Sequence, residues 1–143
     1  MEDNKIKNES EPQVIADALA RRVVSILVEK KAHNVCAFHV GEDNPVTDYY
    51  INATGRSANA VASLADIVVD KLAEEGISAH RVEGKRGDGW ILVDYGNVIV
   101  NVFDEESRKF YNLDRLMPEL SIRDISDIIK EVDEKLGLQE TNI

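Results

Sequence analysis

The residues best suited to recognition chemistry lie close together in the second half of this 143-residue chain. Trp90 begins a short apolar run that ends in Asp94 and Tyr95, and Arg108 and Tyr111 follow in an acidic segment. Large aromatic side chains bury much apolar area in an interface, and charges beside them can pair with a partner of opposite sign. We therefore take these five residues as candidate partner-binding residues.

Each candidate has an ordinary structural alternative. Trp90 is the single tryptophan and could fill the core instead of presenting its ring to a partner, and the same choice holds for the two tyrosines. Asp94 could close a turn with Gly96 rather than offer its charge to a basic partner. Arg108 could simply pair with a nearby acid, or it could fix the shape of residues 111–116. The residue types alone leave these alternatives open.

Residues of the kinds that catalyse reactions are present but are not grouped for catalysis. A nucleotidyltransferase holds its metal with an Asp-x-Asp or Asp-x-Glu pair after a Gly-Ser turn. Residues 55–57 (Gly-Arg-Ser) resemble that turn, but the next acids, Asp66 and Asp70, lie four apart on a predicted helix. The three histidines and the single cysteine have no metal-ligand spacing, and the glycines of residues 84–89 match neither the dinucleotide fingerprint nor the P-loop. The sequence thus predicts no catalytic residue, no metal site and no cofactor.

The spacing of apolar residues predicts two long helices and five strands. Helical periodicity covers residues 12–32, and a second helix begins after the N-cap residue Ser57 and ends near Gly76. The predicted strands are residues 34–40, 47–54, 77–83, 90–95 and 98–103.

These elements predict the fold class. The first two strands are expected to form a hairpin, and the last two another, across a turn at residues 96–97. The helix between the second and third strands permits a parallel crossover. We expect an α/β or α+β domain with a mixed five-stranded sheet, helices packed on it, and the order α-β-β-α-β-β-β.

The two ends of the chain differ in character from this central part. Residues 1–11 are mostly polar and charged, which predicts a mobile tail. Ser121 and Asp124 resemble a capping box, and the apolar residues after Pro118 follow one helical face, which predicts a C-terminal amphipathic helix. That stripe consists of Ile122, Ile125, Ile128, Ile129, Val132 and Leu136.

The stripe must be covered, because an isolated helix of this length is marginal in water. We expect it to pack on the chain's own sheet or first helix, although pairing with a second copy in a homodimer would also cover it. The predicted organisation is a tail at residues 1–11, a domain at 12–117 and a helical extension at 118–143.

The charge balance restricts the partner. Lys and Arg number 17 against 27 Asp and Glu, so the net charge is −10, which opposes nonspecific binding to phosphate backbones. We therefore expect a basic partner and no direct DNA binding. No apolar run is long enough to span a membrane, no secretory signal is visible, and a lone cysteine suits a reducing compartment. These features indicate a cytoplasmic protein with no membrane partner.

The run that holds the candidate residues resembles the signature of a known family. Its pattern is Trp-x-Leu-x-Asp-Tyr-Gly-x-Val-x-Val-x-Val-Phe, followed by Arg-x-Phe-Tyr-x-Leu, with Gly96, Leu113 and Leu116 as structural positions. This pattern is similar to that of the ribosomal silencing factor family, also called the Iojap family. The resemblance covers about residues 12–117 and implies a nucleotidyltransferase-like sheet in a binding protein that is not an enzyme.

The resemblance also implies a function. Members of the family bind the large ribosomal subunit through its fourteenth protein and sterically prevent the small subunit from joining, which represses translation when nutrients are limited. Roles in large-subunit maturation and dimer formation are also attributed to the family. Two alternatives stay open: an assembly adaptor without anti-association activity, and a metal-dependent nucleotidyltransferase, against which the missing Asp-x-Asp pair argues.

Overall fold

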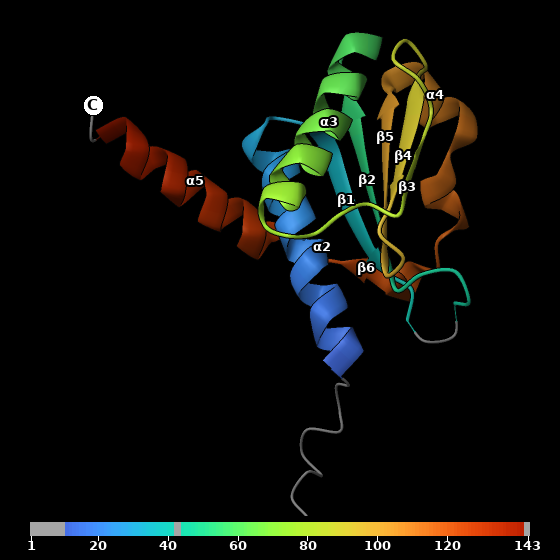
Figure 1. The fold of residues 1–143 in the computed structure, drawn as a ribbon, viewed down its shortest axis with the longest axis horizontal. Helices are drawn as coiled ribbons and strands as arrows, with labels where there is room; N and C mark the ends of the chain where they lie inside the picture. Colours follow the sequence, from blue (N-terminus) through green and yellow to red (C-terminus); the bar gives the residue numbers. More distant parts are fainter. Residues whose placement is uncertain (1–10, 42–43, 142–143) are drawn as a thin grey trace, which may run out of the picture.

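The computed structural model describes residues 11–41 and 44–141, which form a mixed sheet with helices packed on it (Figure 1). Six strands lie in the order β3-β4-β5-β2-β1-β6. They are β1 (His33–His39), β2 (Tyr49–Gly55), β3 (Arg81–Glu83), β4 (Trp90–Asp94), β5 (Val98–Asp104) and β6 (Ile122–Arg123). Strands β2 and β5 run parallel in the centre, and every other neighbouring pair is antiparallel.

Helices α2 (Glu11–Glu29) and α3 (Ala58–Glu74) cover one face of the sheet (Figure 1). Side chains alternate between the two faces along a strand, so every second strand residue meets these helices. On this face the strand residues in the core are all apolar: Ala37, Tyr49, Ile51, Ala53, Ile91, Val93, Val98, Val100 and Val102. Burying such side chains supplies most of the free energy of folding.

The ends of α3 are fixed by local hydrogen bonds. Ser57 is the N-cap, and its side-chain oxygen accepts a hydrogen bond from the backbone N–H of Ala60. At the other end Gly76 has φ +86°, and the Ile77 N–H donates to the Leu72 carbonyl at 2.8 Å. This is the left-handed termination that glycine permits at low cost, as the sequence predicted.

Two short helical segments lie against the other face of the sheet, below called the second face. Helix α4 (Glu105–Tyr111) follows β5 directly, with Asp104 as its N-cap, and the 3-10 helix η1 (Leu113–Leu116) follows after Asn112 in a left-handed conformation. A second 3-10 turn, η2 (Glu119–Ser121), leads into β6. Helix α4 was not predicted from the sequence, because none of its residues is buried and the segment has no apolar stripe.

The fold class is confirmed as a mixed α+β arrangement, but three element predictions were wrong. The sheet has six strands rather than five, because residues 122–123 pair with β1. Of the strand predicted at residues 77–83, only β3 forms. The C-terminal helix α5 (Ser126–Thr141) begins four residues later than a helix with Ser121 as its N-cap would: the Ser121 hydroxyl donates to the Pro118 carbonyl, and the Asp124 carboxylate accepts from the Ser126 N–H.

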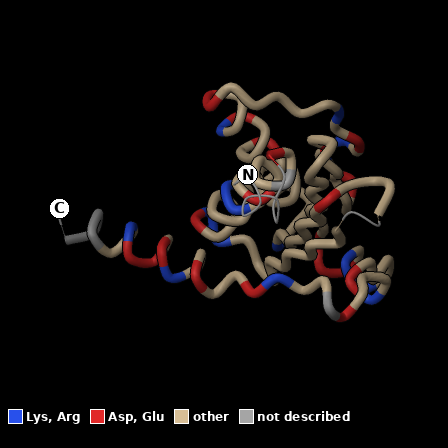
Figure 2. The backbone as a smooth tube through the Cα atoms, turned by 90° about the horizontal axis from the view of Figure 1, so that it is seen from below, with Lys and Arg blue, Asp and Glu red and all other residues tan. Residues whose placement is uncertain are grey.

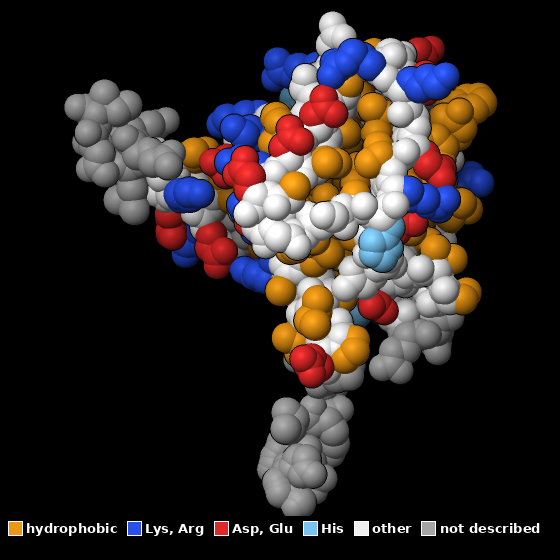
Figure 3. Space-filling model, viewed as in Figure 1, with side chains coloured by type: hydrophobic (Ala, Val, Ile, Leu, Met, Phe, Trp, Pro, Cys, Tyr) orange, Lys and Arg blue, Asp and Glu red, His pale blue; other side chains and the backbone are white. Residues whose placement is uncertain are grey.

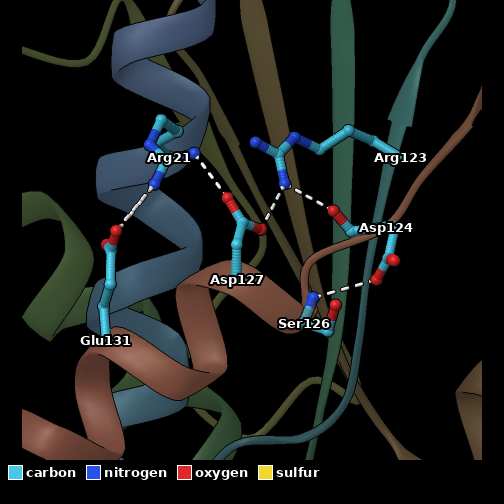
Figure 4. Close-up of polar contacts among 6 residues, drawn as sticks. All are labelled: Arg21, Arg123, Asp124, Ser126, Asp127 and Glu131. Carbon is cyan, nitrogen blue, oxygen red and sulfur yellow. Dashed lines mark hydrogen bonds and ion pairs between the residues drawn. The ribbon is translucent and has the colours of Figure 1, made fainter.

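Helix α5 packs on α2 within the same chain (Figure 4). Ile128 and Val132 are 2% and 3% exposed, whereas Ile122, also placed in the predicted stripe, is 63% exposed because it belongs to β6. Arg21 of α2 lies 2.8 Å from Asp127, which Arg123 also contacts at 2.9 Å. The expectation that the extension packs on the first helix is thus confirmed.

The tail predicted at residues 1–11 lies outside the described residues except for Glu11, which begins α2. Residues 42–43, between the first two predicted strands, also lie outside them. Among the described residues, no helix combines the length and the apolar character that crossing a membrane would need.

Candidate functional site

The second face of the sheet carries buried polar residues as well as apolar ones, whereas the core strand residues of the first face are apolar. The strand residues that alternate with the core positions include Asn52 and Thr54 on β2 and Asn101 on β5, and all three are at most 1% exposed. Asn52 donates to Asp114 of η1 and Thr54 accepts from Arg108 of α4, while Asn101 is hydrogen-bonded to Asn52. Sheet and helical segments therefore meet here through hydrogen bonds.

An ion pair holds α4 and η1 together over the sheet. Arg108 donates to both oxygens of Asp114, from Nε at 3.1 Å and from Nη2 at 2.8 Å, which is the strong two-point geometry of Arg with a carboxylate. Its third nitrogen, Nη1, donates to the Thr54 hydroxyl at 2.9 Å, and the guanidinium lies 6.0 Å from the centre of the Phe103 ring. Arg108 thus ties both segments to β2.

A chain of hydrogen bonds runs from the aromatic edge of this face to the ion pair. The Trp90 indole N–H donates to the Asn101 side-chain oxygen at 3.0 Å, and the Asn101 amide donates to the Asn52 oxygen at 3.1 Å. The Asn52 amide then donates to Asp114 at 3.0 Å. Every donor in the chain points the same way, toward the carboxylate, so both asparagine side chains have one favoured orientation.

Trp90 stands at the start of this chain and is half-buried. Its ring packs between Phe103, at 5.1 Å between centroids, and Tyr111, at 4.6 Å. It also lines a hollow of about 230 Å³ with Glu83, Gly84 and Leu92. Trp90 is therefore neither a fully buried core residue nor a fully exposed one: one part of its ring is packed, and another part borders open space.

Exposed apolar side chains lie on α4 and η1: Tyr111 contacts Trp90, Phe110 contacts Tyr111 at 5.0 Å between ring centroids, and Leu116 follows on η1. Phe110 is 79% exposed, Leu116 68% and Tyr111 47%. We call Trp90, Phe110, Tyr111 and Leu116 the aromatic surface. Such a cluster on segments held by an ion pair can bury apolar area against a partner without first having to become ordered.

The shifted pKa values of Asp114 and Cys36 indicate a structural role for both side chains. Burial alone would raise the pKa of Asp114, but the hydrogen bonds and charge of Arg108, with the Asn52 amide, outweigh it and hold that pKa below its usual value. Burial raises the pKa of the Cys36 thiol, and nearby Arg108 only partly opposes this effect. Cys36 is therefore a thiol at neutral pH, unsuited to act as a nucleophile. Among residues 11–41 and 44–141, no group of three His, Cys, Asp or Glu residues could hold a metal ion.

Asp94 takes its structural alternative. Its carboxylate accepts from the Gly96 N–H at 2.7 Å and from Arg81 at 3.1 Å, so it closes the turn between β4 and β5. Gly96 has φ +88°, and an added Cβ would lie 2.8 Å from the His80 ring. The positive φ favours glycine there, and any larger residue would also require the His80 ring to shift.

Tyr95 also takes its structural alternative, since it is 5% exposed and belongs to the core under the helices. It therefore points away from the face that carries Trp90, so these two candidate partner-binding residues do not lie on one surface. Burial raises its pKa to about 12, and its hydroxyl has no hydrogen-bond partner among the described residues. Leu116, predicted as a structural position, is on the surface instead, while Leu113 is half-buried.

Sequence reasoning missed Asn52, Asn101, Asp114 and Phe110. The two asparagines carried a signal: each stands between apolar residues in the middle of a strand, where asparagine is disfavoured unless its amide is paired. That they pair with each other across 49 residues depends on the register of β2 and β5, which the sequence alone does not give.

The acidic residues that give the chain its negative net charge are spread over the molecule. Figure 2 shows Asp and Glu distributed along most of the backbone, including α5, which extends away from the sheet. The surrounding field therefore repels anionic surfaces in general, and it favours basic partners at whichever face docks.

Comparison with known proteins gives consistent matches. A family model described as "Ribosomal silencing factor during starvation" matches residues 12–142. The ribosomal silencing factor RsfS of Bacillus subtilis (strain 168) is 32% identical over 97 residues, which cover 68% of this chain and 82% of that protein. A mouse protein named "Mitochondrial assembly of ribosomal large subunit protein 1" is 26% identical over 113 residues, 77% of this chain and 48% of its own length.

Solved structures agree in fold. A crystal structure of a protein from Chromobacterium violaceum superposes with a TM-score of 0.67 at 28% identity, over 71% of this chain and 84% of that one. A second, from Bacillus halodurans, gives 0.57 at 32% identity, over 71% and 91%. The family match extends beyond residue 117 into α5, and the predicted division of the chain at that point stays a prediction.

Proposed function

Because the chain belongs to the ribosomal silencing factor family, we propose that it binds the large ribosomal subunit through the subunit's fourteenth protein and blocks small-subunit joining. The resemblance read from the sequence is thereby confirmed at the level of the family. The particular partner protein and the steric mechanism belong to the proposal, as does a place in the cytoplasm beside ribosomes.

The observation that carries the proposal is the aromatic surface. Phe110, Tyr111 and Leu116 are exposed, yet α4 and η1 hold them in place through Arg108 and Asp114. Interfaces draw most of their affinity from a few such aromatic and apolar side chains. A chain with net charge −10 also suits a basic ribosomal protein, because opposite charges speed the encounter.

The proposed action makes and breaks no covalent bond. The described residues include no carboxylate group arranged for a metal, and the one cysteine stays protonated. We therefore propose a stoichiometric factor rather than an enzyme, which needs neither nucleotide nor metal. The nucleotidyltransferase alternative would require metal-dependent incorporation of a labelled nucleotide.

Subunit joining tests the proposal directly. Purified chain added to salt-washed subunits should reduce joining, measured by light scattering, in proportion to the large subunits present. The variant Leu116→Ser should block less well, whereas Ile129→Ser, which changes an exposed apolar residue on α5, should act like the unaltered chain. If joining is unchanged and the chain sediments with neither subunit, the proposal is lost.

A second candidate is an assembly adaptor for large subunits. The named role of the mouse relative favours it. Sedimentation profiles of cells that lack the protein separate the two. Joined ribosomes in excess during starvation support silencing, and accumulated immature large subunits support assembly.

A further inference from the structure

A second hollow lies away from the aromatic surface, where β2 ends and α3 begins. It has a volume of about 420 Å³ and is bordered by the basic residues Lys30, Lys31, His33 and Arg56, which we call the basic pocket. They come from the end of α2, the start of β1 and the turn before α3. Ala60, Leu64 and Ile67 of α3 form an apolar wall. In Figure 3, Lys and Arg side chains gather at the end of the molecule where α3 begins.

Three cations of this pocket border one hollow without a carboxylate partner among the described residues, a state that Lys71, Lys85, Lys109, Arg115 and Lys130 share at other places. Six arginines pair with carboxylates: Arg21, Arg22, Arg81, Arg86, Arg108 and Arg123. For Lys30, Lys31 and Arg56 there is no carboxylate partner among the described residues; Arg56 instead donates to His33 Nε2 at 3.0 Å. In a chain with ten more acids than bases, unneutralised cations converging on one hollow favour an anion from outside.

The backbone beside the pocket adds to this preference. Gly55 ends β2 so close to α3 that an added Cβ would lie 2.9 Å from the Val61 nitrogen. The turn therefore brings the first turn of α3 to the rim, and the helix dipole adds positive potential there. The basic side chains are the main source of positive potential in the pocket, and the helix end adds to it.

Strand register relates the pocket to the aromatic surface. Trp90 pairs with Phe103, Phe103 with Thr54, and Thr54 with His33, so one row crosses four strands from the aromatic surface to the pocket. Neighbouring strands lie about 4.8 Å apart, which makes the row roughly 14 Å long. The pocket is bordered by α3, which covers the first face, so the two sites lie at the same end of the sheet with the aromatic surface on the second face.

We propose that the basic pocket binds phosphate groups of an RNA strand that lies beside the protein partner. The inference rests on the proposed function, because a ribosomal subunit presents protein and RNA side by side. An RNA backbone is favoured over a free nucleotide, since the pocket offers exposed cations from three segments, and Thr54, the buried polar residue in its lining, already accepts a hydrogen bond from Arg108. At other parts of the surface the overall negative charge weakens RNA binding, so RNA contact is confined to this pocket.

Salt dependence tests the contact on the whole subunit. The variant Lys30→Gln/Lys31→Gln should bind large subunits more weakly at low salt, and its plot of log affinity against log salt should be shallower by about 1.4 to 1.8, the effect of two phosphate contacts. Lys71→Gln/Lys130→Gln removes two lysines elsewhere, on α3 and α5, and serves as the matched control. Equal slopes for the pocket variant and the unaltered chain would overturn the inference while leaving the proposed function intact.

Cross-linking identifies what lies against the pocket. Benzoylphenylalanine at Ser63, on the exposed rim, should link to RNA in the bound large subunit, whereas the same probe at Glu134 on α5 should not. Links from Ser63 to protein alone would contradict the inference.

A titration without ribosomes keeps the inference independent of the proposed function. Fluorescein-labelled single-stranded RNA in 50 mM salt should bind both the unaltered chain and the lysine control. It should bind the pocket variant at least fivefold less tightly. Absence of binding, or equal binding by all three chains, overturns RNA contact. Tighter pocket-dependent binding of ATP than of RNA would identify a free nucleotide as the source of phosphate and also overturn it.

Discussion

The two faces of one sheet are built from the same strands but do different work. On the face under α2 and α3, alternate residues of β2, β4 and β5 are apolar and pack into a continuous core. The second face has buried apolar residues such as Ile99 and Phe103, but the same central strands also place Asn52, Thr54 and Asn101 there. Hydrogen bonds link Asn101 to Asn52, Asn52 to Asp114, and Thr54 to Arg108. The first face stabilises the fold through the apolar area that it buries. The second face fixes the positions of α4 and η1 through hydrogen bonds of defined direction.

The difference follows from how the two kinds of contact respond to change. Apolar burial stabilises in proportion to area and tolerates many side-chain combinations. A buried hydrogen bond contributes little net free energy, but removing one partner leaves the other unsatisfied at a larger cost. A polar chain is therefore a poor way to gain stability and a good way to fix where α4 and η1 sit.

The first prediction sets the scale for the apolar face. Leu27→Ala removes a fully buried side chain of α2 and should lower the free energy of unfolding by about 2 to 5 kcal/mol. Urea denaturation followed by circular dichroism measures this loss. A cost under about 1 kcal/mol would mean that α2 contributes little to the core.

The second prediction concerns the polar face. Arg108→Met keeps most of the side-chain volume but leaves Asp114 without its charged donors, and should cost about 2 kcal/mol of unfolding free energy. Arg86→Met removes an exposed arginine that pairs with Asp66 and should cost less than about 1 kcal/mol. Equal losses in the two variants would contradict the view that the Arg108 contacts are special.

The third prediction uses pH to isolate the Asp114 contribution. Its pKa is lower in the folded chain than in the unfolded one, so its ionised form stabilises the fold above about pH 4 and loses that effect as pH falls through the folded value. Asp114→Asn should therefore be less stable than the unaltered chain at pH 6, by about 1 kcal/mol, and the gap should narrow below pH 4. Denaturation curves at pH 6, 4 and 3 measure it, and a constant gap would exclude ionisation as the cause.

The fourth prediction has the smallest effect on stability and separates folding from binding. Phe110→Ser changes a side chain that is 79% exposed and should alter the unfolding free energy by less than about 0.5 kcal/mol. Its affinity for large subunits should nevertheless fall, which co-sedimentation can show. Unchanged affinity would remove Phe110 from the aromatic surface.

The parts of the fold that the sequence predicted are those with local, periodic signals. The helices at residues 12–32 and after Ser57 have apolar stripes, and the hairpin across Gly96 has its turn chemistry, so their spacing reports their structure directly. β6 was missed because two residues are too short for a period, and the isoleucines around it continue the spacing of α5.

The candidate site was predictable only in part, for a different reason. Trp90, Arg108 and Tyr111 are conspicuous residue types, and the structure brings them to one face. Asp114, Asn52 and Asn101 gain their roles from contacts across 49 to 62 residues of chain, which depend on strand register and on the path of η1. Tyr95 was misplaced because side chains alternate between the two faces along a strand. Without a bulge, a residue five positions after Trp90 lies on the opposite face from it.

The position of Trp90 also has an optical consequence. It is the chain's only tryptophan, so all indole emission comes from one site, where the ring N–H is hydrogen-bonded and one part borders open space. Excluding water from that ring by a docked partner changes its surroundings and hence the wavelength of its emission. The unmodified chain therefore carries its own fluorescent reporter at the surface where we expect a partner to dock.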